Sequence, residues 1–237
     1  SKSFRESVYR YSLSSRGTLG QEKEHVHAGK SPAKGGLPDM VRLLKRRDRV
    51  ISSEAQIIFD QLKRNTVTVF NGKARLLTPN DVEIVSRKGK EKLTAPFIFL
   101  AVGARPISPA HLAIDGKHVL DSNSILNLKK VPKSLVVLGA GIIGCEYASM
   151  FSTAGTKVIL VDRRHEILAS VDREIVDHLV ERFSTQGMEL LLSAEAQKIE
   201  RGKGGVKVHL SNGRKVSAEV VLVAQGRFGN TDGLGLE

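Results

Sequence analysis

A glycine pattern, Gly139-Ala140-Gly141-Ile142-Ile143-Gly144, constrains the fold of this chain more than any other feature. It fits the G-x-G-x-x-G fingerprint and stands between an apolar strand pattern over 134–138 and a helical pattern over 142–154. The first glycine allows a tight turn, the second lets a pyrophosphate approach the backbone, and the third lets helix and strand pack closely. Because the N–H groups at a helix N-terminus attract phosphate, the pattern predicts a dinucleotide-binding turn rather than a merely structural one.

An acidic residue follows at the position expected for a ribose ligand. Asp162 ends the next apolar segment, 157–161, where its carboxylate would accept hydrogen bonds from the adenosine ribose and favour NAD over NADP. Arg163 and Arg164 argue the other way, because a guanidinium pairs well with a 2′-phosphate. The alternative interpretation of each arginine, taken alone, is that it is a solvated loop residue and not a phosphate ligand. We expect this edge to accept both cofactors.

Two residues beside the fingerprint have other interpretations. Glu146 is expected in the first turn of the helix, where the dipole favours a carboxylate and where it could face the nicotinamide ribose. Cys145 is expected to be a small packing residue, because no activating base can be placed beside it. The sequence singles out no catalytic residue and no metal ligand.

The second half of the chain alternates between strand and helix patterns, which predicts a parallel sheet. A helix is predicted over 172–186 and strands over 188–192 and 220–224. Between these strands, alternating valines lead to Asn212-Gly213, a strong hairpin signal.

The first half is less regular. It predicts a short helix over 3–13, a loop over 17–36 and a long amphipathic helix over 38–64. A small β-meander is expected next, with strands at 67–70 and 81–85. The apolar run 97–102 predicts a strand that is buried on both faces.

Composition excludes several classes of protein. The formal net charge of +12 suggests a polyanionic partner, but the basic residues are scattered, Trp is absent and only three Tyr occur, which argues against nucleic acid. A single cysteine excludes a disulfide framework and fits a cytoplasmic location. No apolar run approaches the roughly 20 residues of a spanning helix, so no membrane is expected. The chain begins without Met and ends in a turn-rich stretch, so we expect a fragment of a longer protein.

Three ordered motifs resemble those of the flavoprotein reductases with two dinucleotide-binding domains, the pyridine nucleotide-disulfide oxidoreductases. Ser1-Lys2 resembles the end of their I-P-S-K motif, residues 101–106 their A-T-G-S-R-P motif, and residues 224–227 their A-T-G-R motif. Residues 121–126, 144–149 and 226–237 are most similar to the branch that exchanges hydride between NADPH and NAD⁺ through bound FAD.

The resemblance implies an α/β fold, with a Rossmann-like three-layer NAD(P)-binding domain that carries a β-meander at 116–237 and part of a second, FAD-binding Rossmann-like domain at 1–115. It implies homodimerisation of the complete protein and little activity of this fragment alone. The implied FAD contacts are Lys2, Ala74, Gly103 and Ala104. The implied NAD or NADP contacts are Gly139, Ala140, Gly141, Ile142, Ile143, Gly144, Glu146, Asp162, Arg163, Arg164, Ala196 and Gly226.

Two other functions stay open. One is a disulfide reductase of the lipoamide type, whose Cys-x₄-Cys pair would have to lie upstream of Ser1. The other is a non-catalytic dinucleotide-binding module.

Overall fold

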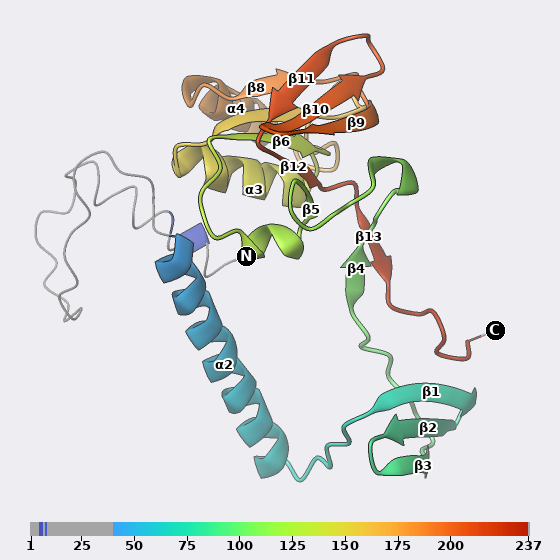
Figure 1. The fold of residues 1–237 in the computed structure, drawn as a ribbon. Coiled ribbons are helices and arrows are strands. Elements are labelled where there is room, and N and C mark those ends of the chain that lie inside the picture. The colour runs from blue at the N-terminus through green and yellow to red at the C-terminus, as the bar shows by residue number, and fades with distance from the viewer. Residues whose placement is uncertain (1–4, 7, 9–39, 237) are drawn as a thin grey trace, which may run out of the picture. The chain divides into compact units, whose positions relative to one another are not determined.

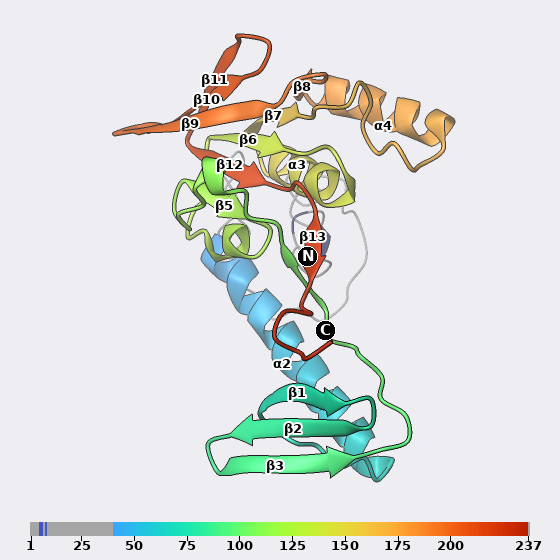
Figure 2. The ribbon, with the colours of Figure 1, turned by 90° about the vertical axis from the view of Figure 1, so that its right-hand side faces the viewer.

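The computed structural model describes residues 5, 6, 8 and 40–236 (Figure 1, Figure 2). Nearly all of the expected helix over 3–13 and the whole expected loop over 17–36 lie outside these residues. The chain forms two compact units. Of the described residues, unit 1 comprises 5, 6, 8, 40–50 and 106–226, and unit 2 comprises 51–105 and 227–236. The domain boundary near residue 115 stays a prediction.

Unit 1 is built on a five-stranded sheet in the order β5-β12-β6-β7-β8, in which all neighbours pair in parallel. The strands are β5 (Val119–Asp121), β6 (Ser134–Leu138), β7 (Lys157–Val161), β8 (Glu189–Leu191) and β12 (Val220–Val223). The connecting helices are α3 (Ile142–Thr153) and α4 (Arg173–Thr185), with short 3-10 turns η1 (Ala110–Leu112) and η2 (Ser124–Asn127). These bounds confirm the predicted strands, helices and parallel pairing of the second half.

Unit 1 has three layers, because alternate residues of its central strands enter two different cores. Leu135 and Val137 of β6 join α3 and α4 in one core. Val136 and Leu138 join the other core with the antiparallel sheet β9 (Ala196–Gly202), β10 (Gly205–Leu210) and β11 (Lys215–Ala218). Figure 1 shows α3 and this β-meander on opposite faces of the parallel sheet. The expected Rossmann-like three-layer fold with a β-meander is confirmed.

Local chemistry explains two of the boundaries in unit 1. The Asp172 side chain accepts a hydrogen bond from the Glu174 N–H and caps the start of α4. Gly213 takes a left-handed φ of 80° between β10 and β11, and the Asn212 side chain accepts from the Arg214 N–H at 3.1 Å. The predicted hairpin is therefore present.

Unit 2 contains the antiparallel sheet β1 (Lys73–Thr78), β2 (Asp81–Ser86) and β3 (Gly89–Thr94). It also contains, except for Pro106, the strand pair made by β4 (Ala104–Pro106) and β13 (Arg227–Gly229). The predicted strand at 81–85 is confirmed. The prediction for 67–70 was wrong: these residues form no strand, and the meander begins later in the chain.

The prediction of a buried strand over 97–102 was also wrong. These residues form no strand, and Phe97 and Phe99 are 80% and 94% exposed. A strand buried on both faces needs neighbouring strands and a layer on each side. The described part of unit 2 pairs its strands only within β1-β2-β3 and β4-β13, so the apolar run stays uncovered.

The long helix α2 (Met40–Arg64) confirms the helix predicted over 38–64. Met40 is buried, and the Arg47 guanidinium donates to the Leu126 carbonyl oxygen at 2.6 Å within unit 1. Farther along, Ile51, Ile58 and Phe59 are exposed. The amphipathic pattern thus predicts the helix, but only its first part is packed in the described structure.

Candidate dinucleotide-binding site

The turn between β6 and α3 gives its three glycines different environments. Gly139 has a left-handed φ of 108°, and a Cβ there would lie 2.5 Å from the Ala224 carbonyl oxygen. A Cβ on Gly144 would lie 1.8 Å from the Gly139 carbonyl oxygen, so the helix and the turn pack as closely as predicted. A Cβ on Gly141 would meet no atom within 4 Å. This second glycine faces open space that a phosphate group can enter.

Helix α3 begins at the carboxyl end of β6, with Gly141 as its N-cap residue and no side-chain cap. The first N–H groups of an α-helix have no intrahelical partner, and the dipole makes this end positive. The turn therefore offers backbone donors to an anion beside the open face of Gly141.

Asp162, directly after β7, is bound tightly by protein groups. Its Oδ2 accepts from the Ala140 N–H at 2.6 Å and from Arg164 Nη2 at 2.9 Å. Its Oδ1 accepts from the Arg164 N–H at 2.8 Å and from Arg164 Nε at 3.0 Å. Burial opposes ionisation, but the bonds from Arg164 and Ala140 outweigh it and hold the pKa of Asp162 below its ordinary value. Asp162 is thus a buried carboxylate.

These elements surround a cleft of about 670 Å³ at the carboxyl ends of the parallel strands. This is the edge at which sheets of this type bind their ligands. The structure brings nine predicted residues together in its walls: Gly139, Gly141, Ile142, Ile143, Asp162, Arg163, Arg164, Ala196 and Gly226. Ala140 and Gly144 are buried beside the cleft and shape the turn. Contact of these residues with a cofactor stays a prediction.

The sequence reasoning missed three polar residues that line the cleft: Ser170, Glu195 and Gln225. They follow β7, β8 and β12. The rule that ligands bind beyond the carboxyl ends of parallel strands could have identified their segments, but not the individual side chains.

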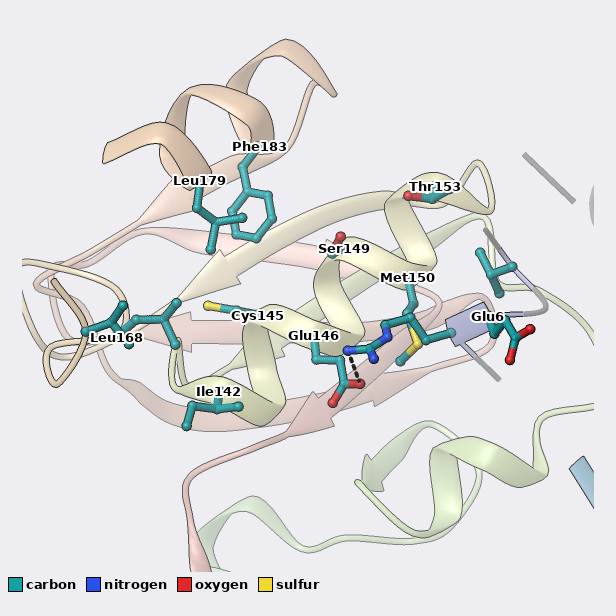
Figure 3. A pocket seen from close by; sticks show the side chains of 13 residues that line it. Glu6, Ile142, Cys145, Glu146, Ser149, Met150, Thr153, Leu168, Leu179 and Phe183 are labelled. Carbon is teal, nitrogen blue, oxygen red and sulfur yellow. Dashed lines mark ion pairs between the residues drawn. The ribbon is translucent and has the colours of Figure 1, made fainter. Parts of the chain in front are cut away.

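Glu146 lies outside this cleft. Because α3 begins at Ile142, Glu146 stands in the second helical turn, and the expectation of a first-turn carboxylate was wrong. Figure 3 shows Glu146 on the wall of a second cavity, of about 780 Å³, where it pairs with Arg5 at 3.4 Å. Ile142 lines both cavities, so they are adjacent.

Cys145 is buried next to Glu146, lines the same second cavity, and donates from Sγ to the Ala140 carbonyl oxygen at 3.4 Å. Burial, with a smaller contribution from the charge of Asp162, raises the pKa of the Cys145 thiol to about 12. Cys145 belongs to the core packed around α3, which confirms the interpretation of this residue as a packing residue.

Of the residues implied for FAD, three belong to the described structure, on two separate segments of the chain. Lys2 lies outside the described residues. Ala74 is in β1, whereas Ala104 begins β4 and Gly103 directly precedes it, where the Asn230 N–H donates to the Gly103 carbonyl oxygen at 3.0 Å. A cavity of about 790 Å³ in unit 2 is lined by residues 69–72, 84–88 and 91, and by none of these three. Ala74 thus lies on a different segment from Gly103 and Ala104, and the FAD contacts of these residues stay a prediction.

A parallel sheet, a glycine fingerprint between its central strand and a helix, and a charged edge on the next strand define a Rossmann-type dinucleotide-binding protein. Comparison with known proteins gives the family. The chain belongs to the pyridine nucleotide-disulphide oxidoreductases, whose sequence profile matches residues 8–237. The resemblance found from the sequence motifs is confirmed.

Curated relatives support the same placement. The chain is 41% identical over 196 residues to proteins named soluble pyridine nucleotide transhydrogenase in Pseudomonas entomophila and Pseudomonas putida. Each match covers 82% of this chain and 42% of the relative, so the chain spans less than half of the relatives' length.

Solved structures show the same fold. The HOCl-induced flavoprotein disulfide reductase RclA from Escherichia coli, solved as a Cu(II) complex, matches with a TM-score of 0.78 at 26% identity, over 98% of this chain and 47% of its own. LpdA from Mycobacterium tuberculosis matches with a TM-score of 0.86 at 24% identity, over 99% of this chain and 50% of its own, which is evidence of fold alone. The expected cofactor classes, FAD with NAD or NADP, agree with the family and with the flavoprotein neighbour.

Within the described residues, no helix combines the length and the apolar character that crossing a bilayer demands.

Proposed function

We propose that the cleft of unit 1 binds NAD(H) and NADP(H), and that the chain is part of an FAD-dependent transhydrogenase that moves hydride between NADPH and NAD⁺. One observation carries the proposal: the open face of Gly141, the start of α3 and the Asp162–Arg164 edge line the same cleft. A complete protein of this kind would work as a homodimer in the cytoplasm.

The residues of the cleft have separable roles. The backbone N–H groups at the start of α3 would hold the pyrophosphate, since Gly141 leaves room for it. The edge formed by Asp162 and Arg164 would hold the adenosine ribose. The flavin, when bound, supplies the acceptor for the hydride, and the residues described here bind and orient the nucleotide.

The names of these curated relatives support transhydrogenation over disulfide reduction. The single cysteine of this sequence, Cys145, is buried and cannot form a Cys-x₄-Cys pair here. Reading the parent coding region upstream of Ser1 separates the two activities. A glycine fingerprint without such a pair would support hydride exchange, and a Cys-x₄-Cys pair would contradict it.

Binding can be tested on the chain itself by titrating it with NADH and NADPH and following nicotinamide fluorescence. We expect saturable binding of both nucleotides. With FAD, NADPH and thio-NAD⁺ added, we expect no efficient turnover by this chain, because it spans less than half of the length of the transhydrogenase relatives. Failure to bind either nucleotide would contradict the proposed function.

A further inference from the structure

The Asp162–Arg164 pair directly follows β7, at the edge where the adenosine ribose is expected. Two parallel bonds join the guanidinium to the carboxylate, Nε to Oδ1 at 3.0 Å and Nη2 to Oδ2 at 2.9 Å. The Asp162 side chain is 6% exposed, whereas the Arg164 side chain is 43% exposed. The guanidinium therefore lies on the solvent side of a carboxylate that is otherwise buried.

The carboxylate oxygens are already engaged. Besides the guanidinium, they accept from two backbone N–H groups, those of Ala140 and Arg164. The Ala140 bond fixes the fingerprint turn, so it cannot be given up without disturbing the phosphate site. A ribose hydroxyl that bonds to Asp162 must therefore replace one or both bonds of the Arg164 side chain.

We infer that Arg164 is an intramolecular competitor of the adenosine ribose for Asp162, and that this ion pair sets the balance between NAD(H) and NADP(H). The inference deepens the proposed function and rests on it. Binding of NAD(H) breaks the pair to reach the carboxylate. Binding of NADP(H) uses the guanidinium instead of displacing it.

The chemistry of the two ligands supports this difference. The fork toward Asp162 uses Nε and Nη2, so the Nη1 side of the partly exposed guanidinium can meet a further anion. A 2′-phosphate is such an anion, and the pairing of Arg164 with Asp162 offsets the negative charge that would repel it. A ribose without the 2′-phosphate carries no charge with which the guanidinium can pair.

Arg163 is the rival for the same role, because it is exposed and also lines the cleft. It has no bond to Asp162 among those that the structure gives for the described residues. If Arg163 alone met the 2′-phosphate, removal of Arg164 would not weaken the binding of the nucleotide that carries this phosphate. This opposite effect on two ligands is specific to the competition.

The test uses isothermal titration of the full 237-residue chain with AMP and with adenosine 2′,5′-bisphosphate, which differ only in the 2′-phosphate. For Arg164→Ala we expect AMP to bind about threefold more tightly, because the ribose no longer has to break a partly exposed ion pair to reach Asp162. We expect adenosine 2′,5′-bisphosphate to bind about tenfold less tightly, because its 2′-phosphate loses the charge-assisted hydrogen bond from the Arg164 guanidinium. Arg164→Lys keeps the charge without the fork and should weaken the bisphosphate less.

Arg173→Ala is the matched control. Arg173 is 90% exposed at the start of α4 and pairs with Asp177 outside the cleft, so its loss removes the same charge from the same unit. Neither affinity should change in this variant. A circular dichroism melt of each variant verifies that it is folded, and Arg164→Gln replaces Arg164→Ala if the latter unfolds.

The outcomes separate the inference from the function. Opposite changes in the two affinities on loss of Arg164 support the inference. If both affinities fall together, or if only Arg163→Ala shifts their ratio, the competition is refuted while dinucleotide binding stands. If neither nucleotide nor NADH binds the unmodified chain, the proposed function fails and the inference fails with it.

Discussion

Gly144 packs against Gly139 so closely that a single Cβ would lie 1.8 Å from the Gly139 carbonyl oxygen. The neighbouring Gly141 has the opposite environment, with no atom within 4 Å of the same virtual Cβ. One glycine therefore serves the packing of the fold, and the other serves the space for a ligand. Alanine substitutions at these two positions can separate the two requirements.

Gly144→Ala is expected to destabilise unit 1. The new methyl group meets backbone, which cannot rotate away, so the start of α3 must shift against β6. Overpacking of this kind costs about 2 kcal/mol or more. Chemical unfolding followed by circular dichroism measures the loss, and a variant as stable as the original chain would contradict the close packing.

Gly141→Ala is expected to leave the fold intact and to weaken dinucleotide binding. Gly141 has a φ of −79°, which alanine adopts without strain, and its Cβ would enter open space. The loss of stability should stay within about 1 kcal/mol, since alanine is a poorer N-cap than glycine. Because the methyl group would occupy the expected path of the pyrophosphate, we expect the affinity for NADH to fall about tenfold or more. Unchanged affinity would show that the pyrophosphate does not lie on this glycine.

Cys145 should resist labelling by a thiol reagent in the folded protein. Its thiol is buried, and a pKa of about 12 instead of 9.0 leaves about a thousandfold fewer thiolates at neutral pH. Reaction with Ellman's reagent is expected to be slow without denaturant and to reach one thiol per chain after unfolding. Rapid labelling of the folded chain would contradict the packing role of Cys145.

The regular half of the fold follows from local sequence pattern. The bounds of β6 and β7 were predicted because an apolar run ends at a glycine fingerprint or at a charged loop. The pair β4 and β13 could not be found this way. Each strand has three residues, and Arg227–Gly229 pairs with Ala104–Pro106, more than a hundred positions earlier in the chain. The hydrophobic periodicity of a short segment does not indicate which distant segment it pairs with.

The candidate site shows the same division between local and non-local information. The fingerprint and Asp162 were predicted from spacing, since both belong to one strand-helix-strand unit. The two-residue step from Asp162 to Arg164 gave no sign that the arginine folds back onto the carboxylate. Glu195 and Gln225 reach the cleft through the order of the sheet, which places β8 and β12 on either side of β6 and β7.

Asp115 should make the stability of unit 1 dependent on acid pH. Its Oδ1 accepts from the N–H groups of Lys117, His118 and Val119, and Oδ2 accepts from Arg201 Nε at 2.9 Å. Partial burial alone would raise its pKa, but these bonds outweigh burial and lower the pKa of Asp115 to about 2. The folded state has the lower pKa, so the stabilisation is complete above about pH 4 and is lost as the pH falls toward 2.

The contribution of Asp115 amounts to at most about 2 kcal/mol at neutral pH. Asp115→Asn is expected to lower the stability at pH 7 and to flatten its decline between about pH 4 and pH 2. Urea unfolding across this range measures both effects. An unaltered pH profile would show that Asp115 is not held as a carboxylate in the folded protein.

Exposed and buried phenylalanines should respond to substitution in opposite ways. Phe97 and Phe99 are 80% and 94% exposed in unit 2, whereas Phe183 is 1% exposed in the core beneath α4. Phe183→Ala should cost about 3–5 kcal/mol of stability, and Phe99→Ser less than about 0.5 kcal/mol. Because neighbouring exposed apolar side chains promote association, Phe97→Ser combined with Phe99→Ser should reduce self-association in sedimentation velocity without lowering the melting temperature. If the double variant instead unfolds at a lower temperature, residues 97–102 are packed in solution.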